Sequence, residues 1–401
     1  MVARAGRRGP GPVRWAARLA AVVAVAAGCT GGTGGGGTGS SGAGGDRDGG
    51  QQQAATATVT VQPAKDADAV SPADPVVVTA AGGTLTGVKV SSAGREITGN
   101  LDTGKTKWTS KTPLAFSTRY AVSAEATNAT GQKTTATSAF TTATATKQVF
   151  PGVSPLRGTT VGVGMPIRVY FDAPVTDRKA AVQHMKVTTS VPTLGAWRWF
   201  SDSEVHWRPR GYWTGGTQVA LDTDLFGVKL GNGVYGGANA DRHIEFTIGR
   251  SQVSIADART HQMTVYVNGK PVRTLPVSMG SDKNPTKGGP HVVIDKNRVK
   301  TMDSRTFGLA LDAGGYRAKV EFATRISNNG EFVHSAPWSV AQQGQSNVSH
   351  GCINLSPANA AWFFGFSQIG DVVDVHGTPK PLGPKDGDIY DWAIPWGQWE
   401  N

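Results

Sequence analysis

Hydrophobic and polar positions alternate with a period of two over much of the chain beyond its N-terminal part. Short runs rich in Val, Ala and Thr occupy residues 58–61, 76–78, 85–90 and 120–126, and Gly, Asn and Asp separate them. Alternation of this kind indicates strands that bury one face. Several short strands at this spacing are typical of a β-sandwich, so the pattern predicts one such module over residues 56–146.

A second block of the same kind follows. Residues 167–171 alternate between apolar and polar side chains, and residues 205–209 lead into a further apolar run. This block echoes the first one, because Trp108 and Trp207 each stand shortly before another predicted strand. We therefore predict two related immunoglobulin-like β-sandwich modules, the second over residues 147–250.

The last block, residues 251–378, combines strands with one clear helix. An Asn-Gly dipeptide at residues 268–269 separates two β-rich runs, and this dipeptide readily adopts the positive φ values of a tight hairpin turn. Ser356 and Pro357 precede an apolar run at residues 359–366, in the order of an N-cap and a first helical residue. The pattern predicts a β-rich domain with one or two short helices, and a mainly β chain. Further strands are predicted at residues 291–294, 318–325, 331–334 and 372–375.

The tail of the chain is rich in Pro and Trp. Trp392, Trp396 and Trp399 stand close together near the C-terminus. Large aromatic side chains contribute much apolar surface when they are buried. We therefore expect residues 379–401 to pack back on the body of the protein.

The N-terminus has the features of an export signal. Five arginines come first, and a short Ala/Val-rich segment follows at residues 19–28 that is too short to cross a bilayer. Residues 26–29 read Ala-Ala-Gly-Cys and resemble a bacterial lipobox, so residues 1–29 are predicted to be a lipoprotein signal whose Cys29 carries the lipid. An ordinary cleaved signal is the alternative. Residues 30–55 are rich in Gly and Ser and predict a flexible tether.

Charge and composition limit the classes of partner that we expect the protein to bind. The formal net charge of +11 falls to +6 when the five arginines before Cys29 leave with the signal, because no acidic residue precedes that cysteine. A mildly basic exported protein suits an anionic cell wall. The predicted lipid on Cys29 would anchor it on the outer face of the cytoplasmic membrane. The sequence contains no basic run with interleaved aromatic residues, so we expect no nucleic-acid partner. No cluster with metal-ligand spacing and no phosphate-binding Gly-rich loop is present, so we expect no metal and no cofactor.

Cys352 is the second of only two cysteines. With Cys29 used for a lipid, Cys352 has no partner within the chain, and an exported protein rarely keeps a lone thiol. A thiol nucleophile needs a base, a group that orients the base, and donors for an oxyanion. His334 ends a predicted strand and is the candidate base, and Gly351 lets a substrate approach the backbone. A small buried thiol without chemistry is the alternative.

Two short segments resemble the active-site signature of the L,D-transpeptidases, cysteine enzymes that cross-link bacterial peptidoglycan. They read His-Ser-Ala-Pro-Trp at residues 334–338 and Ser-His-Gly-Cys-Ile-Asn at residues 349–354. The resemblance extends over essentially the whole exported chain, from the lipoprotein signal through two immunoglobulin-like modules to the Trp-rich tail. This arrangement is similar to the actinobacterial, mycobacterial-type members, and no motif position departs from the pattern.

The resemblance implies a reaction in two steps. Cys352 attacks the carbonyl of the third residue of a tetrapeptide donor stem and expels the terminal D-Ala, with His334 as general base and acid. The carbonyl of Ser335 holds the His334 ring in its tautomer. The acyl-enzyme then reacts with the side-chain amine of the third residue of an acceptor stem, which gives a 3→3 cross-link.

The resemblance also implies what surrounds the thiol. The amides of Gly351 and Cys352 hold the oxyanion, with Tyr316 alongside. Residues 297–316 form a lid with glycine hinges. The other residues implied to shape the loop or contact the substrate are His350, Asn354, Met302, Phe307 and Trp338.

Two other functions stay open on the sequence. Water can intercept the same acyl-enzyme, which would make the protein an L,D-carboxypeptidase, and the outcome depends on how the acceptor groove excludes water. A non-catalytic wall-binding lipoprotein would use its sandwiches as adhesive modules. The resemblance further implies acylation by carbapenems, because a strained β-lactam presents its carbonyl to the same thiolate.

Overall fold

The computed structural model describes residues 55–308, 310–386 and 389–400, and its regular structure is mainly β, as predicted. The predicted lipoprotein signal with Cys29 and nearly all of the predicted tether lie outside the described residues. Within the described ranges, no helix is long and apolar enough to cross a membrane.

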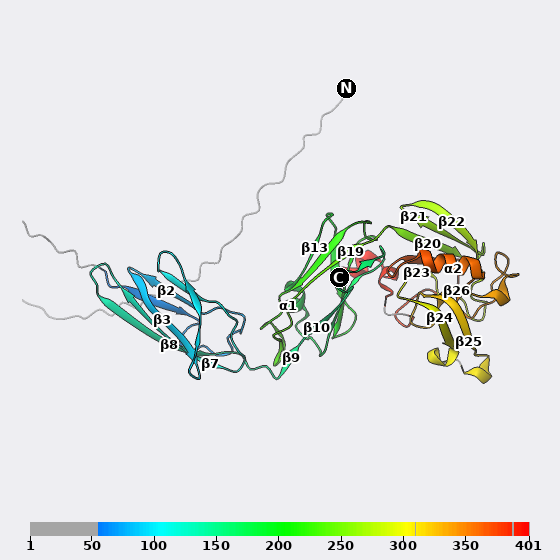
Figure 1. Cartoon of the computed structure of the whole chain (residues 1–401). Helices are drawn as coiled ribbons and strands as arrows, with labels where there is room; N and C mark the ends of the chain where they lie inside the picture. Colours follow the sequence, from blue (N-terminus) through cyan, green and yellow to red (C-terminus); the bar gives the residue numbers. More distant parts are fainter. Residues whose placement is uncertain (1–54, 309, 387–388, 401) are drawn as a thin grey trace, which may run out of the picture. The chain divides into compact units, whose positions relative to one another are not determined.

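The first sandwich consists of strands β1 to β8 (Figure 1). Its two sheets have the strand orders β1-β2-β6-β5 and β4-β3-β7-β8. Their apolar sides share one core, which contains the aromatic side chains of Trp108, Tyr120 and Phe140. The strands are β1 (Thr58–Gln62), β2 (Val77–Ala81), β3 (Thr84–Ser92), β4 (Arg95–Ile97), β5 (Gly99–Leu101), β6 (Lys107–Ser110), β7 (Arg119–Thr127) and β8 (Lys133–Thr141).

The second sandwich consists of strands β9 to β19. Its sheets have the orders β10-β12-β15-β14, β11-β19-β16-β13 and β17-β18-β9. The sequence pattern missed one short helix, α1, which begins after Asp177, whose carboxylate accepts a hydrogen bond from the Ala180 amide (2.9 Å). The elements are β9 (Lys147–Val149), β10 (Pro151–Ser154), β11 (Thr160–Val161), β12 (Ile167–Phe171), α1 (Arg178–Gln183), β13 (Met185–Thr189), β14 (Gly195–Trp199), β15 (Glu204–Pro209), β16 (Gln218–Thr223), β17 (Lys229–Gly231), β18 (Val234–Gly236) and β19 (Arg242–Ile248).

The two sandwiches share a packing detail. Trp108 on β6 and Trp207 on β15 are both buried. Gly99 on β5 and Gly195 on β14 each pair with the residue two positions after the neighbouring tryptophan. A Cβ atom at either glycine would lie 2.1 Å from the indole ring, so only glycine fits there. This common register supports the interpretation of the two blocks as related modules.

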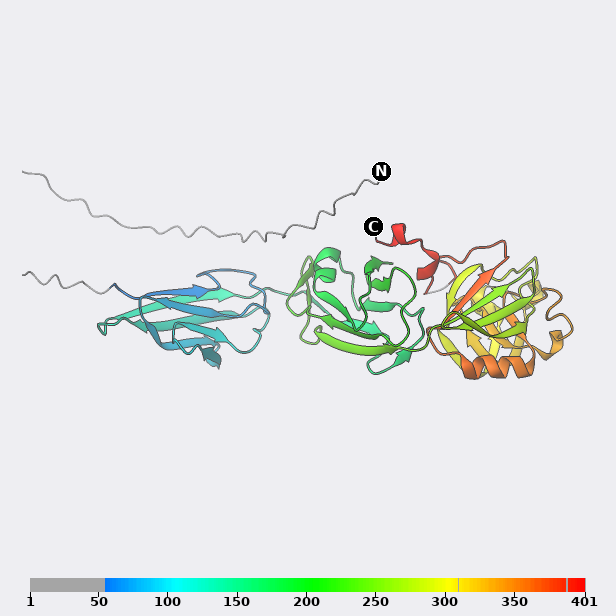
Figure 2. The same cartoon turned by 90° about the horizontal axis from the view of Figure 1, so that it is seen from above.

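The C-terminal domain consists of strands β20 to β28 with helix α2. A five-stranded sheet has the order β22-β21-β20-β28-β23, and a four-stranded sheet has the order β24-β25-β26-β27. Helix α2 runs along one side of these strands, and its Phe363 joins a core with Val333 and Val373 of the two sheets (Figures 1 and 2). The elements are β20 (Gln252–Asp257), β21 (Gln262–Val267), β22 (Lys270–Pro276), β23 (Gly289–Val292), β24 (Asp295–Asp303), η1 (Ser304–Phe307), η2 (Leu311–Ala313), β25 (Arg317–Arg325), β26 (Phe332–Ser335), η3 (Pro337–Ser339), β27 (Ile353–Leu355), α2 (Pro357–Phe366) and β28 (Val372–His376).

Two local predictions in this domain are confirmed. Asn268 and Gly269 join β21 to β22 with φ values of 50° and 75°, as a type I′ hairpin turn requires. Helix α2 begins at Pro357, and the Ser356 side chain accepts a hydrogen bond from the Asn359 amide. In both places, the chemistry of two neighbouring residues fixes the backbone.

The segment expected to form a lid is the first strand of a β-hairpin and the connection that follows it. Residues 297–316 span most of β24, the 3₁₀ helices η1 and η2, and the approach to β25. Gly308 and Gly314 end these 3₁₀ helices with φ values of 90° and 86°, which glycine adopts readily. The sequence pattern missed β24 because most of its side chains are polar.

The tail contacts the second sandwich through aromatic side chains. Trp399 is fully buried, and its indole N–H donates to the carbonyl of Ala196 (2.9 Å). The guanidinium carbon of Arg208 lies 4.4 to 5.4 Å from the ring centres of Trp392, Trp396 and Trp399. Each such contact of a cation with an aromatic face is attractive. The tail elements are η4 (Asp391–Ala393) and α3 (Trp396–Trp399).

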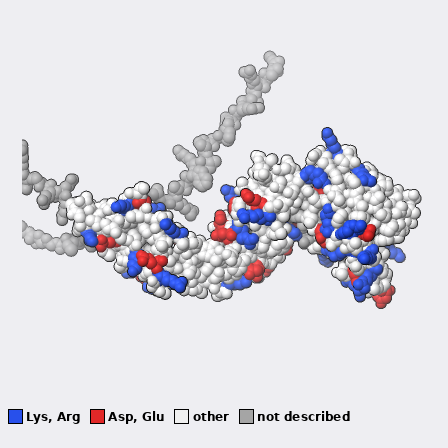
Figure 3. Space-filling model, in the orientation of Figure 1, with Lys and Arg blue, Asp and Glu red and all other residues white. Residues whose placement is uncertain are grey.

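Basic side chains gather on the part of the C-terminal domain that carries β24 and β25 (Figure 3). The side chains of Arg298, Arg305 and Arg317 are each more than half exposed there. Glu321 and Asp303 pair with these arginines, so the surface mixes both signs of charge.

Candidate active site

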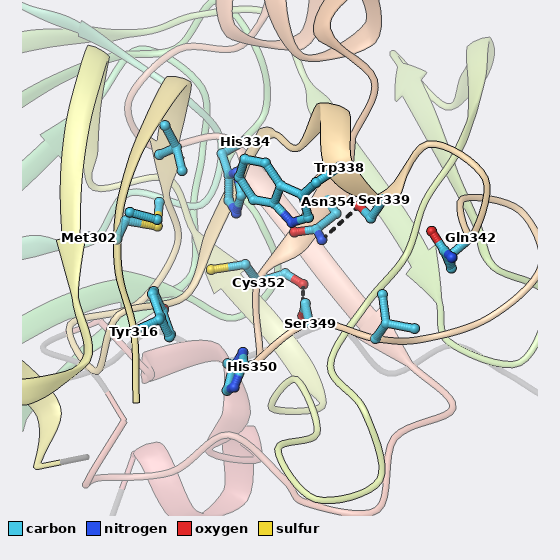
Figure 4. A pocket seen from close by; sticks show the side chains of 13 residues that line it. Met302, Tyr316, His334, Trp338, Ser339, Gln342, Ser349, His350, Cys352 and Asn354 are labelled. Carbon is cyan, nitrogen blue, oxygen red and sulfur yellow. Dashed lines mark hydrogen bonds between the residues drawn. The ribbon is translucent and has the colours of Figure 1, made fainter. Parts of the chain in front are cut away.

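A cavity of about 370 Å³ opens beside β26 and β27 of the C-terminal domain (Figure 4). The β24–β25 hairpin supplies one wall and the segment that follows β26 supplies the opposite one, with Cys352 between them. The lining residues are Met302, Tyr316, Ala318, Val320, His334, Trp338, Ser339, Gln342, Val348, Ser349, His350, Cys352 and Asn354.

Strand pairing brings the thiol and the imidazole together. Strands β26 and β27 run parallel, and His334 pairs with Asn354. Side chains two residues apart in an extended segment point to the same side. Cys352 and Asn354 therefore both face the cavity beside His334, as Figure 4 shows.

The Cys352 thiol is buried and protonated. It is 5% exposed, and its Sγ donates to the carbonyl oxygen of Gly330 (3.6 Å). Burial raises the pKa of the thiol to about 12, with the Phe332 amide acting downward and the Glu331 carboxylate upward. The thiol is therefore neutral at neutral pH, and a base must take its proton before it can act as a nucleophile.

His334 is a neutral base. It is 3% exposed, and its Nδ1 lies 2.8 Å from the carbonyl oxygen of Ser335. A carbonyl oxygen only accepts, so Nδ1 carries the proton and Nε2 is left as the acceptor. Burial lowers the pKa of His334 to about 4, although the bond to Ser335 acts in the opposite direction. The ring is therefore ready to receive a proton at neutral pH.

Ser349, which the sequence reasoning missed, organises the turn before Cys352. Its Oγ donates to the Cys352 carbonyl (2.6 Å) and accepts from the Gly351 amide (3.0 Å). The Gly351 amide is therefore engaged within the turn, contrary to the expectation that it faces an oxyanion. The signal in the sequence was a serine two residues before a glycine, because such a hydroxyl readily accepts from the i+2 amide.

Aromatic rings border the thiol on two sides. The rings of Tyr316 and His350 lie 5.0 Å apart, and the exposed ring of Trp338 lies 6.1 Å from the His334 ring. Burial raises the pKa of Tyr316, and the charge of a Cys352 thiolate raises it further. The phenol therefore keeps its proton and remains a hydrogen-bond donor.

The remaining predicted residues differ in how they reach the cavity. The Asn354 amide donates to Ser339 Oγ (3.1 Å), which ties β27 to the segment after β26. Met302 is buried in the hairpin wall. Ser335 contributes its carbonyl rather than a lining side chain. The side chain of Phe307 lies outside what the structure describes.

The arrangement suits acyl transfer. A thiol and a neutral imidazole share one cavity, the imidazole is oriented by a third group, and a phenol donor lies nearby. These are the parts that a cysteine nucleophile needs. Among the described residues, no group of three or more His, Cys, Asp or Glu side chains is arranged to hold a metal ion.

Comparisons with known proteins agree with this chemistry. Residues 251–375 match the family model of the L,D-transpeptidase catalytic domain, and residues 67–229 match a bacterial Ig domain. The chain is 41% identical to L,D-transpeptidase 2 of Mycobacterium tuberculosis, over 81% of this chain and 79% of the relative. It is 37% identical to L,D-transpeptidase 5 of the same species, over 85% of this chain and 76% of the relative.

A solved structure is also similar. The structure of LD transpeptidase LdtMt1 in complex with imipenem matches with a TM-score of 0.50 and 38% sequence identity. The match covers 57% of this chain and 98% of that one.

Proposed function

Because this chain belongs to the L,D-transpeptidase family, we propose that it forms 3→3 cross-links between peptidoglycan stems through an acyl-enzyme on Cys352. The observation that carries this proposal is the single cavity shared by the Cys352 thiol and the neutral His334 ring. The stems are a tetrapeptide donor and a second stem that supplies an amine.

The first half of the reaction forms the acyl-enzyme. Sγ of Cys352 attacks the carbonyl carbon of the third stem residue while Nε2 of His334 takes the thiol proton. The bond from that carbon to the nitrogen of the terminal D-Ala then breaks, and His334 returns the proton to the leaving amine. The hydrogen bond to the Ser335 carbonyl supports this role, because it keeps Nδ1 protonated and Nε2 as the acceptor.

The oxyanion needs donors that are already in place. The Gly351 amide is engaged by Ser349, so we assign the role to the Cys352 amide with the Tyr316 hydroxyl. The upward shift of the Tyr316 pKa supports the assignment, since a phenol that keeps its proton can donate. The His350 ring contacts Tyr316 at a tilt, and we assign it the role of keeping that ring beside the cavity.

The second half of the reaction transfers the acyl group. The side-chain amine of the third residue of an acceptor stem attacks the thioester carbonyl and loses a proton to His334. The C–S bond breaks, the thiol is restored, and an amide joins the two third residues. Asn354, Met302, Phe307 and Trp338 are proposed to shape the cavity in which the two stems meet.

Carbapenem acylation belongs to the same proposal. The relative LdtMt1 was solved in complex with imipenem. A β-lactam carbonyl is strained, so attack by Cys352 opens the ring and leaves the drug attached to the thiol without a leaving group.

The proposed location follows from the N-terminus. Lipid attachment at Cys29 would hold the protein on the outer face of the cytoplasmic membrane, with residues 30–55 as a tether. We propose the sandwich modules at residues 56–146 and 147–250, the catalytic domain at residues 251–378 and the tail at residues 379–401. A mildly positive charge, part of it around β24 and β25, suits the anionic wall.

Mass spectrometry tests the reaction directly. Protein starting at residue 56 is incubated with a disaccharide-tetrapeptide, beside its Cys352→Ala variant. We expect a cross-linked dimer that lacks one D-Ala, and no dimer with the variant.

Other products would change the assignment. Tripeptide without dimer would make the protein an L,D-carboxypeptidase. An unchanged substrate in both samples, across the common stem diamino acids, would contradict the proposal and favour a wall-binding role. Turnover that survives in Cys352→Ala would remove Cys352 as the nucleophile.

A further inference from the structure

Glu331 lies beneath the nucleophile turn, and none of the roles above uses it. It immediately precedes β26 and is 5% exposed. Its Oε1 accepts from the Lys287 amide (2.8 Å), whereas its Oε2 is buried without a hydrogen-bond partner among the described residues. A buried carboxylate that is only partly satisfied lowers stability unless its position serves another purpose.

Glu331 packs against the backbone that carries the thiol. A Cβ atom at Gly351 would lie 3.6 Å from both Cγ and Oε1 of Glu331, so the carboxylate contacts the turn one residue before Cys352. The residues on either side of Glu331 also face the thiol. The Gly330 carbonyl accepts from Sγ (3.6 Å), and the Phe332 amide lies close enough to stabilise a thiolate.

A buried histidine lies beside Glu331. His291 is fully buried, with Nδ1 3.1 Å from the Ile326 carbonyl and Nε2 2.8 Å from the Lys287 carbonyl. Carbonyl oxygens only accept, so both contacts are satisfied when both ring nitrogens carry protons. The same Nδ1 lies 3.9 Å from Glu331 Oε2.

Burial and the groups around Glu331 shift its pKa in opposite directions. Burial raises the pKa of Glu331, whereas His291, the Lys287 amide, the Ser327 hydroxyl and the Lys287 charge lower it. His291 and Lys287 favour the ionised carboxylate, although burial is the larger effect and the net shift of the Glu331 pKa is upward. The charge of an ionised Glu331 in turn raises the pKa of the Cys352 thiol.

We propose that Glu331 is a positioning residue for the nucleophile: its buried carboxylate supports the Gly351 turn and keeps the resting Cys352 thiol protonated. This inference rests on the proposed role of Cys352. An anion beside a thiol disfavours the thiolate. The proton then leaves only when His334 accepts it during attack, and a lone exported thiol is protected from oxidants and other electrophiles, which react with the thiolate.

Alkylation of the full chain by iodoacetamide across pH tests the inference. The reaction is measured by mass spectrometry on the peptide that carries Cys352, so that Cys29 does not contribute. We expect the wild-type midpoint to lie above the ordinary thiol pKa of about 8.5. Glu331→Gln keeps an acceptor for the Lys287 amide but removes the charge, so its midpoint moves down and alkylation at pH 7.5 becomes about 3- to 10-fold faster.

Two further variants separate charge from geometry. Glu321→Gln removes an exposed carboxylate of β25 and leaves the midpoint unchanged. Glu331→Asp keeps the charge, but its shorter side chain no longer contacts the Gly351 turn. We therefore expect a midpoint near that of the wild type together with a lower kcat.

Three outcomes would overturn the inference. They are an unchanged or higher midpoint in Glu331→Gln, a shift of the same size in Glu321→Gln, and a wild-type midpoint at or below the ordinary value. The last comparison needs no variant, so it can overturn the inference even if Glu331→Gln does not fold, and the Glu331→Asp variant then tests the carboxylate itself. The midpoint is independent of turnover, so it also separates this inference from the transpeptidase proposal, which the Cys352→Ala experiment tests.

Discussion

Two buried histidines of this chain have pKa values shifted in opposite directions. His334 in the cavity is 3% exposed, contacts one carbonyl oxygen, and has a pKa lowered by burial to about 4. His206 on β15 is fully buried, and its two ring nitrogens each lie 2.9 Å from a carboxylate oxygen, one of Glu204 and one of Asp391. Burial acts to lower the pKa of His206 too, but the two carboxylates raise it more, so the net shift is upward.

The difference shows that burial alone does not set the charge of a histidine. A carbonyl oxygen orients the ring without holding a second proton, which leaves a neutral base for chemistry. Two carboxylates hold both protons, which makes a charged link between β15 and the tail. A link of this kind is stable only while it is complete, because a buried charge without its partner is strongly destabilising.

His334→Ala separates the two histidines most clearly. The variant removes the base, so we expect transpeptidation to fall by about 10²–10⁴-fold with little loss of folding stability. The measurement is dimer formation from disaccharide-tetrapeptide together with a thermal melt.

His376→Ala is the matched control, because His376 is an exposed histidine of the same domain. This control should keep the wild-type rate. A His334→Ala variant that retains activity within a few-fold would show that another group takes the Cys352 proton.

His206→Leu should lower the folding stability and leave transpeptidation nearly unchanged. Asp391 is then left buried without its charged partner, so we expect the unfolding free energy of the second sandwich with its tail to fall by about 3–5 kcal/mol. Urea unfolding followed by tryptophan fluorescence measures this loss. Transpeptidation well below the melting temperature should change little, because His206 lies outside the cavity.

His243 provides the matched control for this second prediction. It too lies between two carboxylates, Asp222 and Glu245, but on the exposed surface of the same sandwich. Exposed ion pairs contribute little to stability. Similar losses in His206→Leu and His243→Leu would mean that burial does not distinguish the two sites.

Local chemistry explains which features could be predicted from the sequence. The turn at Asn268 and the helix start at Ser356 depend on adjacent residues, and both are confirmed. Cys352 and His334 lie in two segments that resemble a known active-site signature, and this resemblance suggested them as a pair.

Features that depend on distant or polar residues could not be predicted. Asp391 lies 185 residues from His206, and no pattern in either segment indicates the pairing. Strand β24 carries mostly polar side chains because one of its faces is open to solvent. Glu331 stands beside the motif, but only the packed turn shows what it touches.

The pH dependence of folding stability is the smallest expected difference between His334 and His206. His334 has a lowered pKa, so its neutral form contributes fully above about 6.5, and stability falls by up to about 3 kcal/mol as the pH drops toward 4. His206 has a raised pKa, so its contribution is complete below about 6.5 and is lost as the pH rises through the folded value.

Each variant removes the pH dependence that its histidine contributes to the folding stability. Relative to wild type, His334→Ala should therefore gain stability in acid, and the deficit of His206→Leu should shrink at alkaline pH. Urea titrations at several pH values measure both, with tryptophan fluorescence for the tail and reaction of Cys352 with a pyridyl disulfide for the C-terminal domain. Equal slopes for the two variants would mean that the pKa values of the two buried histidines are shifted in the same direction, because only shifts in opposite directions give dependences of opposite sign.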